Sequence, residues 1–442
     1  MTGTEILALT MLGGFMAMIL IGIPVGISLA VSGLVFGYIG FGPGLLGLLP
    51  SRIYGVVTNY TLLAIPLFVF MGVMLEKSRI ADELLETLGH AMGGLRGGMG
   101  IAIVLVGVLM GAATGIVGAT VVTVGLLTLP VLMRRGYGRG VACGTICASG
   151  TLGQILPPSL VLILLADILG ESVGSLFAAA LIPGLTLALV YVVYLVLLGL
   201  LRPDTVPPIP AAERDALPAL ELWKRIGRSV APALLLVFAV LGSIIGGVAA
   251  PTEAASMGAA GSLVIAALSG RLDRGVLGET LKGTVSISAM VFFILICAQP
   301  FALAFRGLGG EHLVQGLFAW VPGGLNAELL FMMLLLFVLG FFLEWIEISY
   351  IALPLFLPLF QNADVDMIWL GILVAMNLQA SFLTPPFGWA LFFLKGVAPP
   401  EISTRDIYAG VLPFIGLQLV ALGLLFLFPG LATWLPTAIG WN

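Results

Sequence analysis

Long, uninterrupted apolar runs dominate the pattern of hydrophobic and polar positions along this chain. Charge-free stretches cover residues 6–51, 97–133, 140–166, 172–201, 367–394 and 407–442. Each stretch is long enough to cross a hydrocarbon core of about 30 Å as an α-helix. A transmembrane barrel would instead need polar and apolar residues to alternate within segments of ~10 residues. The pattern therefore predicts an all-α polytopic membrane protein.

Most of the apolar segments have the length of a single membrane span. We predict spans at residues 5–40, 43–76, 139–169, 173–200, 229–249, 252–270, 281–306, 366–396 and 407–430. Two further stretches, 97–133 and 327–361, are too long for one span, since 37 residues of helix measure about 55 Å, and too short for two spans and a turn. Poor helix formers interrupt the first of them from Gly111 to Gly118. Both stretches are therefore predicted to be re-entrant hairpins.

The distribution of basic residues gives these segments an orientation. If residue 1 is cytoplasmic, sixteen of the 18 lysines and arginines lie inside, and only Arg52 and Arg306 lie outside. This is the bias that the positive-inside rule describes. It requires the hairpin at 97–133 to enter from the cytoplasm and the hairpin at 327–361 to enter from outside. The count predicts a cytoplasmic N-terminus and a C-terminus on the outer side.

Hairpins that enter from opposite faces predict an inverted repeat. Residues 1–200 and 250–442 would form the two repeats, each with a hairpin, a broken span and a final span. The prolines support this register: those at 130, 157 and 158 stand 228 residues before those at 358, 385 and 386, and Pro24 stands 227 before Pro251. At the start of the second repeat, Pro251 and Glu253 are ordinary helix-start residues, and we expect Glu253 to cap the helix.

A polar linker at 201–228 and a connecting span at 229–249 would join the two repeats. The prolines from 203 to 210 predict a stiff, extended piece. Residues 212–228 then have the pattern of an amphipathic helix on the cytoplasmic membrane surface, with basic residues near anionic lipid. An arm that docks a partner is the alternative.

Composition narrows the possible function classes. Hydrophobic residues make up 60% of the chain and charged residues 9%, against about 25% charged in soluble domains. A globular cytosolic enzyme is therefore excluded. Cys143, Cys147 and Cys297 lie in apolar runs and are interpreted as small hydrophobic residues rather than as a disulfide or metal site. A net charge of −4 without a basic patch gives no indication of nucleic-acid binding, and the N-terminus lacks the basic region of a cleaved signal peptide.

Two of the spans contain a double proline near their middle. Pro157-Pro158 interrupts the span at 139–169, and Pro385-Pro386 interrupts the span at 366–396. Each proline removes a backbone donor and clashes with the preceding helical turn, so the helix must unwind. Unwinding frees carbonyl oxygens that suit a desolvated Na⁺, and it leaves a half-helix N-terminus that suits a carboxylate. A simple proline kink is the alternative.

Polar residues gather at the predicted hairpin tips. The first tip offers hydroxyl groups and close backbone approach through Thr114, Gly115, Gly118 and Thr120. The second tip carries Glu344, Trp345, Glu347 and Ser349. Carboxylates within a membrane are costly and usually functional. The glutamates could bind ions or could cap the second hairpin helix; alternatively, 327–361 could make two full crossings with both glutamates in a cytoplasmic turn.

These features together resemble a known family, the DctM-type large membrane subunit of tripartite ATP-independent periplasmic (TRAP) transporters. The resemblance covers essentially the whole chain and is carried by residues 21–26, 64–68, 111–118, 155–159, 250–255 and 383–388. Residues 343–349 further resemble the subgroup labelled for mannitol or chloroaromatic compounds, whose binding proteins are associated with 2-oxo acids and lactate. The family more often has Asp where Glu344 stands.

The resemblance implies a transporter rather than an enzyme. It would be an inverted-repeat, elevator-type importer of small organic anions in the bacterial inner membrane, coupled to Na⁺ and without an organic cofactor. Two partners are implied: a small four-helix membrane subunit and a periplasmic substrate-binding protein. A Na⁺- or H⁺-coupled carboxylate symporter that works without a binding protein is the alternative.

The resemblance also implies sites where each hairpin tip meets a broken span. One Na⁺ site would be framed by Thr114, Gly115, Gly118, Gly153 and Pro157. The other would be framed by Glu344, Ser381, Thr384 and Pro385. The substrate would lie between the tips, and the residues expected to contact it are Thr114, Gly115, Ser159, Trp345, Gln379 and Phe387.

Overall fold

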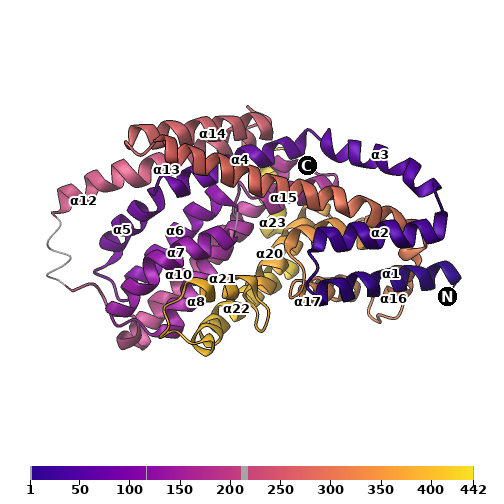
Figure 1. Ribbon diagram of the computed structural model, residues 1–442. Helices are drawn as coiled ribbons and strands as arrows, with labels where there is room; N and C mark the ends of the chain where they lie inside the picture. The colour runs from indigo at the N-terminus through magenta and orange to yellow at the C-terminus, as the bar shows by residue number, and fades with distance from the viewer. Residues whose placement is uncertain (1, 116, 211–217, 442) are drawn as a thin grey trace.

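The computed structural model describes residues 2–115, 117–210 and 218–441, and this part of the chain is built from helices without strands (Figure 1). Six helices of the described part are long and apolar enough to cross a membrane, and a bent pair with a 53° break makes a seventh span. The six are α1 (Gly3–Leu20), α7 (Val117–Arg134), α10 (Val173–Leu201), the continuous helix Leu220–Ile245, α15 (Arg274–Gly307) and α22 (Thr404–Leu427). The bent pair consists of α3 (Gly44–Val57) and, after a 3-10 turn at Thr61–Leu63, α4 (Ala64–Lys77).

Short polar side chains define where several of these helices begin. The Asp273 carboxylate accepts a hydrogen bond from the Val276 N–H at 2.8 Å at the start of α15, and Ser403 caps α22 through the Asp406 N–H at 3.2 Å. The Glu253 carboxylate accepts from the Ala250 N–H at 2.9 Å, which confirms the expected capping role of this residue. Such caps satisfy backbone donors that have no partner within the helix.

The second half of the chain repeats the helices of the first half in the same order. The first hairpin consists of α6 (Gly98–Thr114) and α7; the second consists of α17 (Leu325–Leu339), α18 (Trp345–Glu347), a π-helical segment (Ile348–Ala352) and α19 (Leu353–Gln361). The broken spans are α8 (Arg139–Thr151) with α9 (Leu160–Leu169), and α20 (Met367–Leu383) with α21 (Trp389–Val397). The predicted all-α fold with two hairpins and two broken spans is therefore confirmed.

The remaining helices also correspond between the halves. α2 (Val25–Phe41) and α5 (Ile80–Met92) precede the first hairpin. In the same way, α14 (Pro251–Leu268) and α16 (Gly310–Phe318) precede the second hairpin. After the broken spans come α10 and α22, and α23 (Gly430–Ala438) ends the described chain. These pairs extend the proline register of the sequence to whole helices.

The prediction of a single span at residues 5–40 is wrong. The chain instead forms two helices, α1 and α2, which pack side by side (Figure 1). The turn between them contains Gly22 in the left-handed region, with φ +94, followed by Pro24, which cannot continue α1. The apolar run is unbroken across this turn, but its length of 36 residues, too long for one span by the argument applied to 97–133, and the residues Gly22 and Pro24 were signs of it. The orientation of the N-terminus, which the charge count derived from a single crossing at 5–40, stays a prediction.

The linker between the halves also differs from the prediction. Residues 211–217 lie outside the described part, and the helix that follows is not a separate surface element. α12 (Ala219–Arg225) runs through a π-helical segment (Ile226–Val230) into α13 (Ala231–Ile245). The helix that contains the connecting span therefore begins before residue 229. Its first turns, in α12, are polar and belong to the same continuous helix.

Residues 203–210, which we call the strap, cross the base of the first hairpin. The Ile209 N–H donates to the Gly93 carbonyl at 2.8 Å, the Gly97 N–H donates to Val206 at 3.0 Å, and the Gly138 N–H donates to Thr205 at 2.9 Å. Val206 and Ile209 of the strap are buried. The extended, proline-rich piece is thus fixed to both ends of the hairpin.

The helices gather into two bundles. The first bundle contains α1–α4 and α13–α15, in which α15 packs along α2, α3 and α4, and α14 packs along α4. The hairpin bundle contains α6–α10 and α17–α22, in which α8 packs against α6, α7 and α22, and α20 packs against α9, α17 and α22. Figure 1 shows the first bundle along the top and right of the molecule and most of the hairpin bundle below it. The functional site described below lies where the two bundles meet.

Candidate functional site

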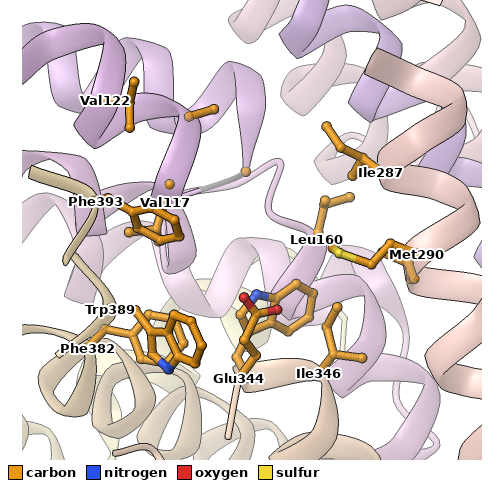
Figure 2. Close-up of a pocket in the computed structure, with 15 residues that line it drawn as sticks. Val117, Val122, Leu160, Ile287, Met290, Glu344, Ile346, Phe382, Trp389 and Phe393 are labelled. Atoms are coloured by element: carbon orange, nitrogen blue, oxygen red, sulfur yellow. The ribbon is translucent and has the colours of Figure 1, made fainter. Parts of the chain in front are cut away.

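A cavity of about 380 Å³ lies between the two hairpin tips (Figure 2). Five parts of the chain line it: the tip of the first hairpin, the tip of the second hairpin, the first residue of α9, the broken span of the second half, and α15 of the first bundle. The lining residues are Gly115, Val117, Gly118, Ala119, Val122, Leu160, Ile287, Met290, Val291, Glu344, Trp345, Ile346, Phe382, Trp389 and Phe393. The volume is in the range typical of small-molecule sites.

The first hairpin tip depends on a glycine. Gly115 ends α6 in the left-handed region with φ +61, and its N–H donates to the Gly111 carbonyl at 2.9 Å. A Cβ at Gly115 would lie only 3.2 Å from the Leu160 nitrogen. The tip therefore lies directly against the start of α9, where a larger residue would be both strained and crowded.

Each hairpin also crosses a broken span at a close approach of small residues. A Cβ on Gly111 of α6 would lie 2.5 Å from the Gly153 Cα in the first break. In the second half, a Cβ on Gly340 at the end of α17 would collide with the Ser381 side chain of α20. The same kind of crossing thus fixes both tips next to both breaks.

Two half-helices start at the cavity wall. Leu160 is the first residue of α9 and Trp389 is the first residue of α21, and both line the cavity. Neither helix start has a side-chain cap. Uncapped helix N-termini carry free N–H donors and partial positive charge. The arrangement therefore favours a negatively charged group between the two helix starts.

Glu344 is the charged side chain among the described residues that line this cavity. Its carboxylate points into the open space between the aromatic residues and the aliphatic residues in Figure 2. Aromatic rings form much of the remaining wall, and those of Trp389 and Phe393 lie 6.4 Å apart at a tilt of 35°. The Phe393 ring lies over Gly118, where a Cβ would come within 2.8 Å of the ring.

Some of the predicted site residues line the cavity. Gly115, Gly118, Glu344 and Trp345 are in its wall. Thr114 ends α6 beside them, and its side chain lies outside the described part of the structure. The structure thus brings together residues from both predicted Na⁺ sites and from the predicted substrate site.

The other predicted site residues do not line the cavity and lie in the two breaks or in the last turns of α20. Gly153 and Pro157 are buried in the first break. The Ser159 hydroxyl donates to the Gln154 carbonyl at 2.6 Å. The Gln379 amide donates to the Thr151 hydroxyl at 3.5 Å, a contact between equivalent positions of the two repeats.

In the second break, both hydroxyl groups bond to the preceding helical turn. Ser381 donates to the Leu378 carbonyl at 2.7 Å, and Thr384 donates to Ala380 at 2.9 Å. Each hydroxyl oxygen keeps lone pairs for a further partner. Pro385 is partly exposed, and Phe387 is 44% exposed with its ring 5.4 Å from that of Phe342. Phe387 therefore lies outside the cavity wall.

Several buried oxygen atoms around the breaks lack a hydrogen-bond partner among the described residues. They belong to the Gln154 and Gln379 side-chain amides, the Glu347 carboxylate and the Ser349 hydroxyl. Leaving such a group unsatisfied costs about 1–3 kcal/mol. Oxygen atoms of this kind are the type of ligand that a desolvated Na⁺ requires.

Sequence reasoning missed most of the cavity wall. Ile287, Met290 and Val291 come from α15, and no local feature distinguishes them from other residues of that apolar helix. Trp389 could have been found, because it is the first helical residue after the second break. Val122 and Phe393 reach the cavity only through tertiary packing.

A polar contact that the sequence analysis did not predict joins the two bundles. The Asp167 carboxylate of α9 accepts hydrogen bonds from the Asn59 amide at 2.6 Å and from the Tyr350 hydroxyl at 2.7 Å. Asn59 lies in the bend of the first bundle, where its own oxygen accepts from the Thr61 N–H at 2.9 Å. Tyr350 lies in the second hairpin. One carboxylate thus connects the first bundle, a broken span and a hairpin.

Comparison with known proteins gives consistent results. Residues 12–431 match the family described as "Tripartite ATP-independent periplasmic transporter, DctM component". The C4-dicarboxylate TRAP transporter large permease protein DctM of Pseudomonas aeruginosa is 31% identical over 90% of this chain and 92% of its own length. The ectoine TRAP transporter large permease protein TeaC of Halomonas elongata is 27% identical over 98% of both chains.

A permease with a longer chain and a solved structure are also similar. The sialic acid TRAP transporter permease protein SiaT of Haemophilus influenzae is 27% identical over 95% of this chain, which corresponds to 66% of that protein. The crystal structure of the Alcanivorax borkumensis YdaH transporter aligns with a TM-score of 0.61, covering 88% of this chain and 89% of that one at 15% identity. The latter similarity concerns the fold.

Proposed function

The chain belongs to the DctM family of large permease subunits of TRAP transporters, and from that premise we propose that it imports small organic anions coupled to Na⁺. It is a transporter subunit and not an enzyme. The substrates we propose are carboxylates of the 2-oxo acid and lactate type. The family relatives are named for different substrates, among them C4-dicarboxylate, ectoine and sialic acid.

The observation that carries the proposal is the convergence of two helix N-termini on one cavity. The starts of α9 and α21 both reach the cavity wall, and neither is capped by a side chain. Their N–H groups can hold a carboxylate that has left its hydration shell. Because both helix starts come from broken spans next to hairpin tips, the bound anion would lie within the hairpin bundle.

Coupling to Na⁺ is supported by the buried, unpartnered oxygen atoms near the breaks and by Glu344. A cation next to Glu344 would compensate for a carboxylate that the apolar cavity otherwise leaves unpaired. Cotransport also gives the import of an anion a driving force. Each net positive charge that enters contributes about 2.3 kcal/mol per 100 mV of membrane potential. Two or more Na⁺ ions with one monovalent anion would use that force.

The proposed mechanism is of the elevator type. The hairpin bundle would carry the substrate and Na⁺ across the membrane against the first bundle, to which α15 and Asn59 belong. The cavity between the bundles and the separate packing of each bundle support this division. The family also implies two partners, a small four-helix membrane subunit and a periplasmic binding protein that delivers the substrate.

We further propose an orientation in the bacterial inner membrane. The basic loops lie in the cytoplasm and the C-terminus lies in the periplasm, with Trp434 and Trp441 near the interface. We propose that α2 (Val25–Phe41) crosses the membrane as α1 does, which places the N-terminus in the periplasm as well. This assignment reverses the expectation from a single span at 5–40.

The test is substrate uptake into proteoliposomes that contain this chain with its small subunit. Pyruvate and lactate are supplied with and without the binding protein, under an inward Na⁺ gradient or with choline in place of Na⁺. We expect uptake only when both Na⁺ and the binding protein are present. Uptake that persists in choline would exclude Na⁺ coupling. Uptake with Na⁺ alone would support the self-sufficient symporter instead.

A further inference from the structure

A polar pocket of about 590 Å³ lies between α5 and the first bundle, away from the cavity at the hairpin tips. Figure 1 shows α5 and α12, which contact each other, at the left of the molecule. The described lining comes from α5 with the turn before it, from the continuous helix that contains α12, and from the loop before α15. It consists of Arg79, Asp82, Glu83, Glu86, Thr87, Arg225, Arg228, Ser229 and Arg271.

Ion pairs across the pocket connect its walls. The Arg271 guanidinium donates to the Glu83 carboxylate and to two backbone carbonyls just before α5, the latter at 3.1 Å and 2.6 Å. The Arg225 guanidinium donates to the Glu86 carboxylate at 3.0 Å. Both arginines belong to the side of the first bundle and both glutamates to α5. The pocket is therefore enclosed by two walls that are joined by charged groups.

These pairs leave one positive charge in excess. The described lining contains four arginines and three carboxylates. Glu83 and Glu86 are paired, and Asp82 interacts electrostatically with Arg79. The exposed Arg228 guanidinium has no hydrogen bond or ion pair to another residue within the described part of the chain. Its planar set of N–H donors matches two oxygen atoms of a phosphate group.

The pocket lies at the ends of three membrane spans. The bent span ends with α4 at Lys77, the continuous helix Leu220–Ile245 begins with α12, and α15 begins at Arg274. On α12, Leu220 is 68% exposed and Trp223 is 70% exposed. An exposed tryptophan at the polar end of a span is typical of the membrane interface. The arginines therefore lie at the depth of phospholipid headgroups, where basic pockets between spans bind anionic lipids.

We propose that this pocket binds the phosphodiester headgroup of an anionic phospholipid, with Arg228 as the main phosphate ligand. A headgroup with one negative charge matches the single positive charge in excess. The acyl chains would lie along the exposed apolar surface of the adjoining spans. Because α5 leads directly into the first hairpin, the lipid would link the base of that hairpin to the first bundle. The inference does not depend on the proposed transport function.

The test measures lipid binding to the purified, delipidated complex of this chain with its small subunit. Native mass spectrometry follows phosphatidylglycerol, phosphatidylethanolamine and phosphatidylcholine with identical acyl chains. Thermal denaturation compares these lipids with glycerol 3-phosphate and inorganic phosphate. We expect phosphatidylglycerol to bind about fivefold more tightly than the other two lipids and to raise the melting temperature, which the soluble phosphates leave unchanged.

Each alternative source of binding has its own outcome. Binding of the three lipids with equal affinity, or tighter binding of phosphatidylethanolamine, would overturn the anionic class. Stabilisation by glycerol 3-phosphate or inorganic phosphate as large as that by phosphatidylglycerol would overturn the lipid as the source of the phosphate group.

Variants assign the binding to this pocket. Arg228→Gln is expected to weaken phosphatidylglycerol binding about fivefold, since it removes a charged phosphate donor. Arg274→Gln is the matched control, because it removes the same charge from an exposed residue at the start of α15 that does not line the pocket. Equal losses in both variants would show general attraction to a basic surface and would contradict a defined site.

A third variant is expected to bind more tightly, so that a loss of folding cannot imitate it. Asp82→Asn removes a carboxylate from the pocket wall and increases the excess of positive charge. Because the phosphate then meets less repulsion, we expect tighter binding of phosphatidylglycerol and unchanged binding of phosphatidylcholine. Affinity for phosphatidylglycerol that is unchanged or lower in this variant would contradict the charge balance on which the proposal rests.

Discussion

At the scale of single residues, glycine decides how closely the hairpins approach the broken spans. Gly111 and Gly153 leave no room for a Cβ between α6 and the first break. Gly115 is needed both for its left-handed conformation and for its contact with the start of α9. These glycines position the free N–H groups of α9 at the cavity, although they contribute no side chain to it.

A methyl group at Gly111 tests this packing. Gly111→Ala would force α6 away from Gly153, and overpacking of this kind costs about 1–3 kcal/mol. The control is Gly416→Ala in α22, where no atom lies within 4 Å of the added Cβ. We expect the first variant to lower the apparent melting temperature in detergent by several degrees and the second to leave it unchanged or raise it. Equal melting temperatures would show that the hairpin and the break are not in close contact.

Glu171, in the loop between α9 and α10, provides a prediction that depends on pH. Burial, and then the negative charge of Asp366, raises the pKa of this carboxyl above its ordinary value. A raised carboxyl pKa destabilises the folded state when the group is ionised, and this penalty is relieved as pH falls through the folded-state pKa. Glu171→Gln is therefore expected to raise the melting temperature slightly at pH 7 and to have no effect near pH 4. A stabilisation of the same size at both values would exclude the electrostatic explanation.

At the scale of elements, the hydrogen bonds of Asp167 distinguish contacts within the hairpin bundle from contacts across its boundary. The bond to Tyr350 joins two parts of the hairpin bundle, so both partners would move together. The bond to Asn59 crosses to the first bundle. In an elevator cycle the first bond can persist, whereas the second must break.

Cross-linking tests whether this boundary moves. We expect Asn59→Cys combined with Asp167→Cys to lose most uptake after treatment with a short, cleavable bifunctional thiol reagent and to recover it after cleavage. The three native cysteines are buried, which limits background reaction. Each single-cysteine variant is the control for simple modification. Full uptake by the cross-linked double variant would mean that the two bundles do not slide past each other at this point.

At the scale of the whole molecule, sequence predicted the membrane class, both hairpins and both broken spans, because long apolar runs and double prolines are local signals. The division of residues 5–40 into α1 and α2 leaves no dip in hydropathy, since the turn at Gly22 is as apolar as its flanks, but the length of the run and Pro24 could have indicated it. Cavity residues such as Met290 were equally inaccessible, because their position depends on how α15 packs against the hairpins. Glu344 was found because a carboxylate is conspicuous within an apolar run.

The proposed membrane orientation can be checked directly. If α1 and α2 each cross the membrane, as proposed, an epitope tag before Thr2 is expected to be removed by protease added to intact spheroplasts. A tag after α10, in the basic cytoplasmic region, is the protected control. Protection of the N-terminal tag until the cells are lysed would restore the single crossing at this end of the chain.

The hydrogen bonds of the strap also fix where the covalent connection between the two bundles begins. From Ile209, bonded to Gly93 at the base of the first hairpin, ten peptide steps lead to Ala219 at the start of α12. A fully extended chain spans at most about 3.6 Å per residue, so this connection can reach no further than about 36 Å. Since α12 continues into α13 of the first bundle, the connection would be a tether between the moving and the stationary part in the proposed elevator cycle. In that cycle its length in residues would limit how far apart Ile209 and the start of α12 can move, whatever substrate is carried.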